Sequence, residues 1–217
     1  ATGTSGNDLI ANMTPGQRQD PGLIYAQAAF FQRSGLTVMA LQLARGLKAA
    51  PTQEVAARTW TTDRRKMGVN ALAAGDYQGA YGAAANTGLI VGPDAAEAEF
   101  YAGWIALTRL KRPQDADRHF AAIEKIGSSP ITRARALYWR GRAAEASGQQ
   151  DRAHGFYGAA AKHNTTFYGQ LAGEKVGGHR LNLGRDPTIT QSDRNRFEGR
   201  DAVRAARMLY EIGNKDL

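Results

Sequence analysis

The chain has 217 residues and a mass of 23.4 kDa, a length that allows one large domain or two small ones. Its 42% hydrophobic and 22% charged residues exclude a wholly disordered chain, and the absence of cysteine excludes disulfides, cysteine nucleophiles and thiolate metal sites. The longest apolar stretches are far shorter than the roughly 20 residues that a membrane span needs, so no membrane span is predicted. The net charge of +8 favours a polyanionic partner: nucleic acid, anionic lipid, or a cell-wall polymer rich in carboxylates.

Small residues dominate the composition, with 39 alanines and 25 glycines beside only 8% aromatic residues. Such a composition indicates elements that pack closely rather than a core of large side chains. Helical periodicity is interrupted at Gly35, Gly75, Lys111 and Gly148, which are separated by 40, 36 and 37 residues. An alanine follows each interruption by five residues, and the next position on the same helical face follows it by nine. These positions are Ala40, Ala80, Ala116 and Ala153, and then Ala44, Ala84, Phe120 and Tyr157.

The pattern around each interruption is a helix, a tight turn and a second helix, so the repeating unit is predicted to be a helical hairpin. In chain order we expect helix pairs at 22–34 and 36–47, 63–74 and 76–86, 95–110 and a partner from Pro113, and 131–147 and 149–163. Ser129 is the expected cap of the fourth pair, and Thr165 or Thr166 caps a single helix that ends at Gly177-Gly178. Stacked hairpins predict an all-α fold, an α-solenoid of antiparallel hairpins of the tetratricopeptide type.

This pattern predicts a helical-repeat domain over 1–178, a loop over 179–192 and a last, incomplete helical segment over 193–217. The stretch 177–193 lacks periodicity and is rich in turn-forming residues. Beyond it, one more helix closed by Gly213-Asn214 is indicated by Phe197, Val203, Ala206, Leu209, Tyr210 and Ile212. The small residue expected five positions after Gly213 would fall at 218, so we expect the chain to be an internal part of a longer protein.

No motif for catalysis, metal or nucleotide binding is present. The histidines lack metal-ligand spacing, so a surface or capping role is expected for His119, His154, His163 and His179. Neither a nucleotide-binding glycine loop nor a nucleophile elbow occurs. The carboxylates are scattered among basic neighbours, and Glu145 near Arg142 is expected to form a solvated ion pair. The sequence therefore predicts no catalytic residue, no metal site and no cofactor.

Basic residues cluster on the helix predicted over 131–147. Arg133 and Arg140 share one face and Arg135 and Arg142 the adjacent one, so this helix has a broad basic flank. Together with Tyr138 these arginines are candidates for a ligand-binding strip. The alternative is that they form solvated faces and ion pairs between repeats, with the aromatic residues in the core. Nucleic-acid binding is not expected, because the known signatures and a repeated base-reading pair of side chains are both absent.

Four segments, in this order, resemble the soluble lytic murein transglycosylases. They are AEFYAGWIAL at 98–107, ARALYWRGRAAEA at 134–146, TFYGQLA at 166–172 and RAARMLYEIG at 204–213. The resemblance implies a periplasmic enzyme with a superhelical domain, a small helical linker and a C-terminal lysozyme-like catalytic domain. Such an enzyme cleaves the β-1,4 bond between N-acetylmuramic acid and N-acetylglucosamine without water, using one Glu as acid and base, and leaves a 1,6-anhydro product without a metal. The ES pair and the GLMQ run of that catalytic domain do not occur here.

The resemblance therefore implies the superhelical part of a lytic transglycosylase followed by the start of its linker, 193–217. We expect this part to position the missing catalytic domain and to contact peptidoglycan strands, with glycan contacts from Arg133, Arg135, Tyr138, Arg140 and Arg142. Its basic side chains would attract the free carboxylates of the peptide stems. On its own it is expected to bind peptidoglycan weakly and to cleave nothing. The alternative is a tetratricopeptide-like adaptor that binds a protein or peptide partner, since the same periodicity serves both.

Overall fold

The computed structural model describes residues 10, 12–178 and 186–213, and every regular element in these ranges is a helix. The predicted all-α class is therefore confirmed. Contacts divide the chain into two compact units, 1–181 and 182–217. Within the described ranges, no helix is both long enough and apolar enough to cross a membrane.

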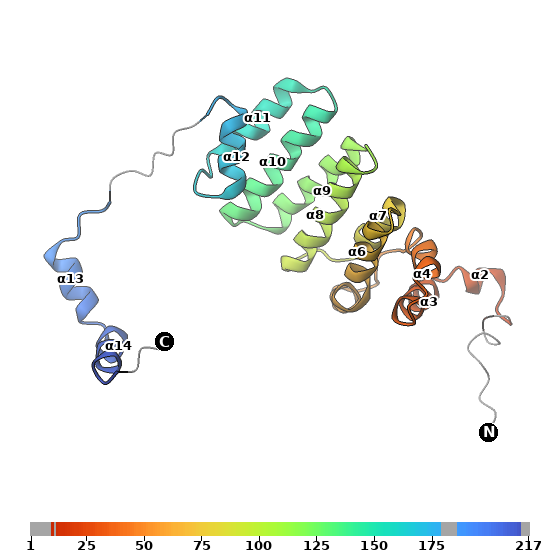
Figure 1. Cartoon of the computed structure of the whole chain (residues 1–217), viewed down its shortest axis with the longest axis horizontal. Coiled ribbons are helices and arrows are strands. Elements are labelled where there is room, and N and C mark those ends of the chain that lie inside the picture. The colour runs from red at the N-terminus through yellow and green to blue at the C-terminus, as the bar shows by residue number, and fades with distance from the viewer. Residues whose placement is uncertain (1–9, 11, 179–185, 214–217) are drawn as a thin grey trace. The chain divides into compact units, whose positions relative to one another are not determined.

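The first unit is built from antiparallel helix pairs that pack in chain order (Figure 1). The pairs are α3 (Pro21–Arg33) with α4 (Thr37–Ala44), α6 (Arg65–Ala73) with α7 (Tyr77–Ala84), α8 (Gly92–Thr108) with α9 (Pro113–Ile126), and α10 (Pro130–Ala146) with α11 (Gln150–Ala161). Neighbouring pairs contact each other through α4 and α7, α7 and α8, and α9 and α10. The short helix α2 (Pro15–Arg18) precedes them, and α12 (Phe167–Lys175) packs on α10 and α11. The four predicted hairpins are thus present.

The turn inside each hairpin has a residue in the left-handed region, at the four positions where the sequence pattern is interrupted. The φ angles are 74° at Gly35, 75° at Gly75, 57° at Lys111 and 73° at Gly148. This conformation ends a helix by letting the next N–H reach back to a carbonyl of its last turn, as Leu36 does to Phe31. The third turn is one residue longer, because the N–H of Arg112 reaches back six residues to Ala106.

The small residues lie where helices approach closely, as the composition indicates. Ala40, Ala80 and Ala116 are fully buried, and Ala153 is 2% exposed. A Cβ atom at Gly82 would lie 2.2 Å from the carbonyl oxygen of Ala44, so α4 and α7 pack almost backbone to backbone. Aromatic rings need glycine in the same way: a Cβ at Gly103 would lie 2.6 Å from the Phe120 ring, and one at Gly141 would lie 2.5 Å from the Tyr157 ring.

Two helix predictions are wrong. The first helix of the second hairpin was expected to start at 63, but α5 (Gln53–Thr59), the π-helix η1 (Trp60–Arg64) and α6 follow one another without a break. The hydroxyl of Thr52 caps its start by accepting the N–H of Val55. In the second unit, the single helix expected beyond the loop is instead two, α13 (Gln191–Glu198) and α14 (Asp201–Glu211).

The caps and the loop boundary follow local chemistry. Ser129 caps α10 and Thr166 caps α12, as predicted. A capping box between Thr190 and Asp193 starts α13 inside the stretch predicted as a loop. Most of the remaining loop, with His179, and the closing residue Asn214 lie outside the described residues.

Candidate functional site

The arginine strip predicted on α10 separates into side chains with different environments. Arg140 is tied to α9, because its Nε lies 2.8 Å from Asp117 Oδ1 and its Nη1 lies 2.8 Å from Glu124 Oε1. Its guanidinium also stacks 4.2 Å from the centroid of the Phe156 ring on α11. Arg152 of α11 pairs with the second oxygen of Asp117 at 2.8 Å. These contacts match the alternative interpretation of ion pairs between repeats.

Tyr138 and Arg142 belong to a cluster that joins α10, α11 and α12. Tyr138 is 7% exposed, and its ring lies among other aromatic rings. Arg142 pairs with Glu145 at 3.5 Å, as predicted, and both side chains are partly exposed. Glu145 also accepts hydrogen bonds from Tyr157 Oη at 2.9 Å and from Lys175 Nζ at 3.0 Å. Burial opposes its ionisation, but these hydrogen bonds outweigh burial and lower the pKa of Glu145.

Arg133 and Arg135 have no acidic partner within ion-pair distance among the described residues. Arg133 is exposed, and the Arg135 guanidinium lies 4.8 Å from the centroid of the Phe100 ring. Arg135 also lines a cleft of about 680 Å³ at the start of α8, together with the carboxylates of Asp94 and Glu97. Of the five side chains predicted to contact glycan, Arg133 is exposed without an ion pair in the described ranges, and Arg135 is half-buried without one.

The three side chains of a second basic run, Arg64-Arg65-Lys66, lie in three different environments. Arg64 is 2% exposed and makes hydrogen bonds only to backbone carbonyl oxygens, including those of Ala83 at 2.9 Å and Ala85 at 2.7 Å. The guanidinium thus caps the C-terminal end of α7, where the helix dipole is negative. Burial lowers its pKa from 12.5 to about 10. Arg65 pairs with Glu97 at 3.5 Å, and Lys66 is exposed.

Lys66 lines an open cleft, which we call the α3–η1 cleft. This open cleft of about 810 Å³ lies between α3 and the continuous helix α5–η1–α6. Its lining includes Tyr25, Arg33, Val55, Arg58, Thr62 and Lys66, together with the buried Asp63. A π-helix turn is rare and often occurs at functional sites, and here it borders the cleft. None of these residues was predicted as a site from the sequence.

Asp63 is the buried carboxylate of the α3–η1 cleft, and hydrogen bonds hold it in place. It is 5% exposed and accepts three hydrogen bonds: from Arg33 Nη1 at 2.9 Å, from Tyr25 Oη at 2.7 Å and from Thr62 Oγ1 at 2.8 Å. Burial, followed by the bond to Asp63, raises the pKa of Tyr25 to about 12. Arg58 and Lys66 are exposed at the cleft and have no acidic partner within ion-pair distance among the described residues.

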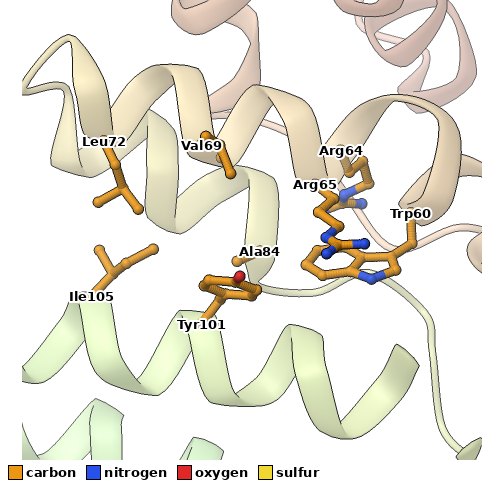
Figure 2. A pocket seen from close by; sticks show the side chains of 9 residues that line it. Trp60, Arg64, Arg65, Val69, Leu72, Ala84, Tyr101 and Ile105 are labelled. Atoms are coloured by element: carbon orange, nitrogen blue, oxygen red, sulfur yellow. The ribbon is translucent and has the colours of Figure 1, made fainter. Parts of the chain in front are cut away.

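A smaller pocket between α6 and α8 is filled by side chains. Figure 2 shows Val69 and Leu72 of α6 pointing toward Tyr101 and Ile105 of α8, with Trp60 at one end. The remaining space is about 10 Å³, which is the size of one water molecule at most. This pocket is part of the packing between the second and third hairpins.

His119 has a more specific environment than the surface or capping role expected for it. Its Nδ1 lies 2.6 Å from Glu99 Oε2, and its Nε2 lies 2.9 Å from Tyr81 Oη. Arg112 covers the Tyr81 ring at 4.6 Å from the centroid. This partly buried network joins α7, α8 and α9. Within the described ranges, no group of three or more His, Asp or Glu side chains is close enough to hold a metal ion.

Comparison with protein-family models, with curated proteins and with solved structures finds no match for this chain. The likeness to lytic transglycosylases therefore rests on the four sequence segments alone.

Proposed function

We propose that this chain is a non-catalytic scaffold, the superhelical α-solenoid region of a periplasmic lytic transglycosylase, which contacts peptidoglycan strands. The parent enzyme would cleave the bond between N-acetylmuramic acid and N-acetylglucosamine to a 1,6-anhydro product, and this region would hold its catalytic domain near the strand. The sequence resemblance supports the family. The packed hairpins support a scaffold, because such arrays present extended surfaces for binding.

One observation carries the binding part of the proposal: basic side chains without an acidic partner lie on the first helix of two hairpins. They are Arg58 and Lys66 on α5–η1–α6 and Arg133 and Arg135 on α10. Other exposed arginines are paired: Arg118 of α9 and Arg152 of α11 lie against aspartates. Arg58, Lys66 and Arg133 are exposed, and Arg135 is half-buried. Unpaired cations at a surface attract carboxylates such as those of wall peptide stems.

The test is retention of the purified chain by isolated cell-wall sacculi at two salt concentrations. The Debye length falls from about 30 Å at 0.01 M to about 3 Å at 1 M salt, so an electrostatic complex should form at the first and dissociate at the second. We expect salt-sensitive retention and no release of 1,6-anhydro muropeptides. Release of that product by this chain would refute a non-catalytic role.

Absence of retention at both salt concentrations would refute wall binding and favour the tetratricopeptide-like adaptor. A double variant, Arg133→Gln with Arg135→Gln, tests the predicted strip. Its matched control is Lys125→Gln with Lys162→Gln, which removes the same charge from exposed positions without an ion pair in the described structure. Weaker retention of the first variant only would support a specific surface, and equal loss in both would indicate that only net charge matters.

A further inference from the structure

Two cations line one wall of the α3–η1 cleft. Arg58 and Lys66 lie eight residues apart on one continuous helix and both line the cleft. At the α-helical rise of about 1.5 Å per residue their Cα atoms would be roughly 12 Å apart along the helix axis, which is an upper bound because the wider π-helical turn lies between them. Thr62 lies between them and also lines the cleft. The cleft wall is therefore an ordered row of two positive groups with a hydroxyl between them.

The opposite wall adds a third cation whose position is set by the protein. The Nη1 of Arg33 on α3 is held 2.9 Å from Asp63, while its side chain remains 62% exposed. Since Asp63 already accepts hydrogen bonds from Tyr25 and Thr62 as well, it is fully engaged and does not neutralise Arg58 or Lys66. With one carboxylate and three cations, the cleft keeps a net charge of +2.

The chemistry of the lining favours carboxylates over phosphate. Phosphate sites commonly use free backbone N–H groups at a helix N-terminus or in a glycine-rich loop. The cleft residues lie within helices, and Val55, the nearest to a helix start, donates its N–H to the Thr52 hydroxyl. Only side chains remain to neutralise an anion here. Guanidinium groups bind carboxylates, as they do phosphates, with two parallel hydrogen bonds, so it is the lack of free backbone N–H groups that favours carboxylates here.

The spacing fits an extended peptide. Residues four apart in an extended chain are separated by about 13 Å, close to the separation of Arg58 and Lys66. Val55 and the Tyr25 ring provide apolar surface beside the charged row, and the open cleft of about 810 Å³ has room for several residues. We propose that the α3–η1 cleft binds a short extended peptide that carries at least two carboxylates. This inference deepens the proposed function, on which its biological setting rests, by assigning wall contact here to peptide stems rather than to sugars.

The experiment measures binding of a synthetic probe, acetyl-Glu-Ala-Ala-Ala-Glu-amide, to the chain by isothermal titration calorimetry at low salt. The test variant is Arg58→Gln with Lys66→Gln, and the control is again Lys125→Gln with Lys162→Gln. All four positions are exposed, so folding should be unchanged, and thermal melting of each variant verifies this. We expect the cleft variant to bind at least about tenfold more weakly and the control to bind within about twofold of wild type.

A second probe, with both Glu replaced by Gln, should also bind at least about tenfold more weakly to wild type. Equal binding of the charged and neutral probes, or equal loss in the cleft and control variants, would overturn the proposal. Absence of measurable binding by wild type would overturn it too.

Sacculi retention separates this inference from the proposed function. If the probe binds in the cleft but sacculi do not retain the chain, the peptide site is supported and the wall-binding function is refuted. If sacculi retain the wild type and the cleft variant equally, the wall-binding function is supported and the assignment of peptide stems to this cleft is wrong.

Discussion

Replacing Arg64 by Met should destabilise the first unit strongly, because the guanidinium satisfies carbonyl oxygens that have little access to water. Its well-formed hydrogen bonds reach Ala85 at 2.7 Å, Ala83 at 2.9 Å, Lys48 at 3.0 Å and Gly82 at 3.1 Å. At about 1 kcal/mol net for each bond, the four sum to roughly 4 kcal/mol of unfolding free energy. Burial of the charge, seen in the pKa lowered to about 10, is a cost already contained in those net values.

A loss of about 4 kcal/mol is a large part of the 5–15 kcal/mol that stabilises a typical domain. With about 2–4 °C for each kcal/mol in a domain of this size, the Tm should fall by roughly 8–16 °C. Urea unfolding and thermal melting followed by circular dichroism at 222 nm measure both quantities.

The neighbouring residue supplies the control. Arg65→Met removes an arginine from the same helix, but its ion pair with Glu97 is 3.5 Å long and its side chain is 54% exposed. Such exposed pairs contribute about 0–1 kcal/mol. If Arg64→Met cost no more than Arg65→Met, the carbonyls of α7 would be reached by water and the capping argument would be wrong.

Three further predictions concern turns, close packing and pH. Lys111→Gly should stabilise the chain by about 0.5–1 kcal/mol in urea unfolding, because φ is 57° at this turn; no gain would mean that the left-handed lysine is unstrained. Gly103→Ala, against the Phe120 ring, should cost about 1–3 kcal/mol, whereas Gly155→Ala, with open space at its Cβ, should be neutral or stabilising; similar melting of both would contradict the packing. Tyr25 ionises near pH 10 when unfolded and near 12 when folded, so its contribution is complete below pH 10 and is lost as pH rises toward 12. The fall of Tm with pH above 10 should therefore be smaller in Tyr25→Phe.

The hairpin register could be predicted from the sequence because each turn has a local cause. A left-handed residue ends a helix, and glycine adopts this conformation readily. Gly35, Gly75 and Gly148 mark the turns by residue type together with their regular spacing, since other glycines lie inside helices. The buried alanines follow at fixed helical spacing, which does not depend on distant contacts. At Lys111 the residue type gives no turn signal, so this turn is predicted from its register and from Pro113, which starts the partner helix.

The π-helix could not be predicted in this way, because a helical period assumes equal steps. One wider turn at Trp60–Arg64 breaks the period and hides the helix that starts at Gln53. The turn also places Asp63 and Arg64, two adjacent residues, in different buried environments: against α3 and against the end of α7. The sequence shows both as charges in a basic run. Their burial depends on contacts with residues 16 to 38 positions away.

Salt should weaken wall binding but not the stability of the fold, so loss of retention at high salt can be distinguished from unfolding. The first unit is held by buried alanines, by aromatic rings seated on glycine and by the carbonyl bonds of Arg64, none of which is screened by salt. Its ion pairs are partly exposed and contribute little each. High salt therefore leaves the scaffold folded while it screens exposed cations such as Arg58, Lys66 and Arg133. Release from sacculi at high salt then reports on electrostatic binding and not on unfolding.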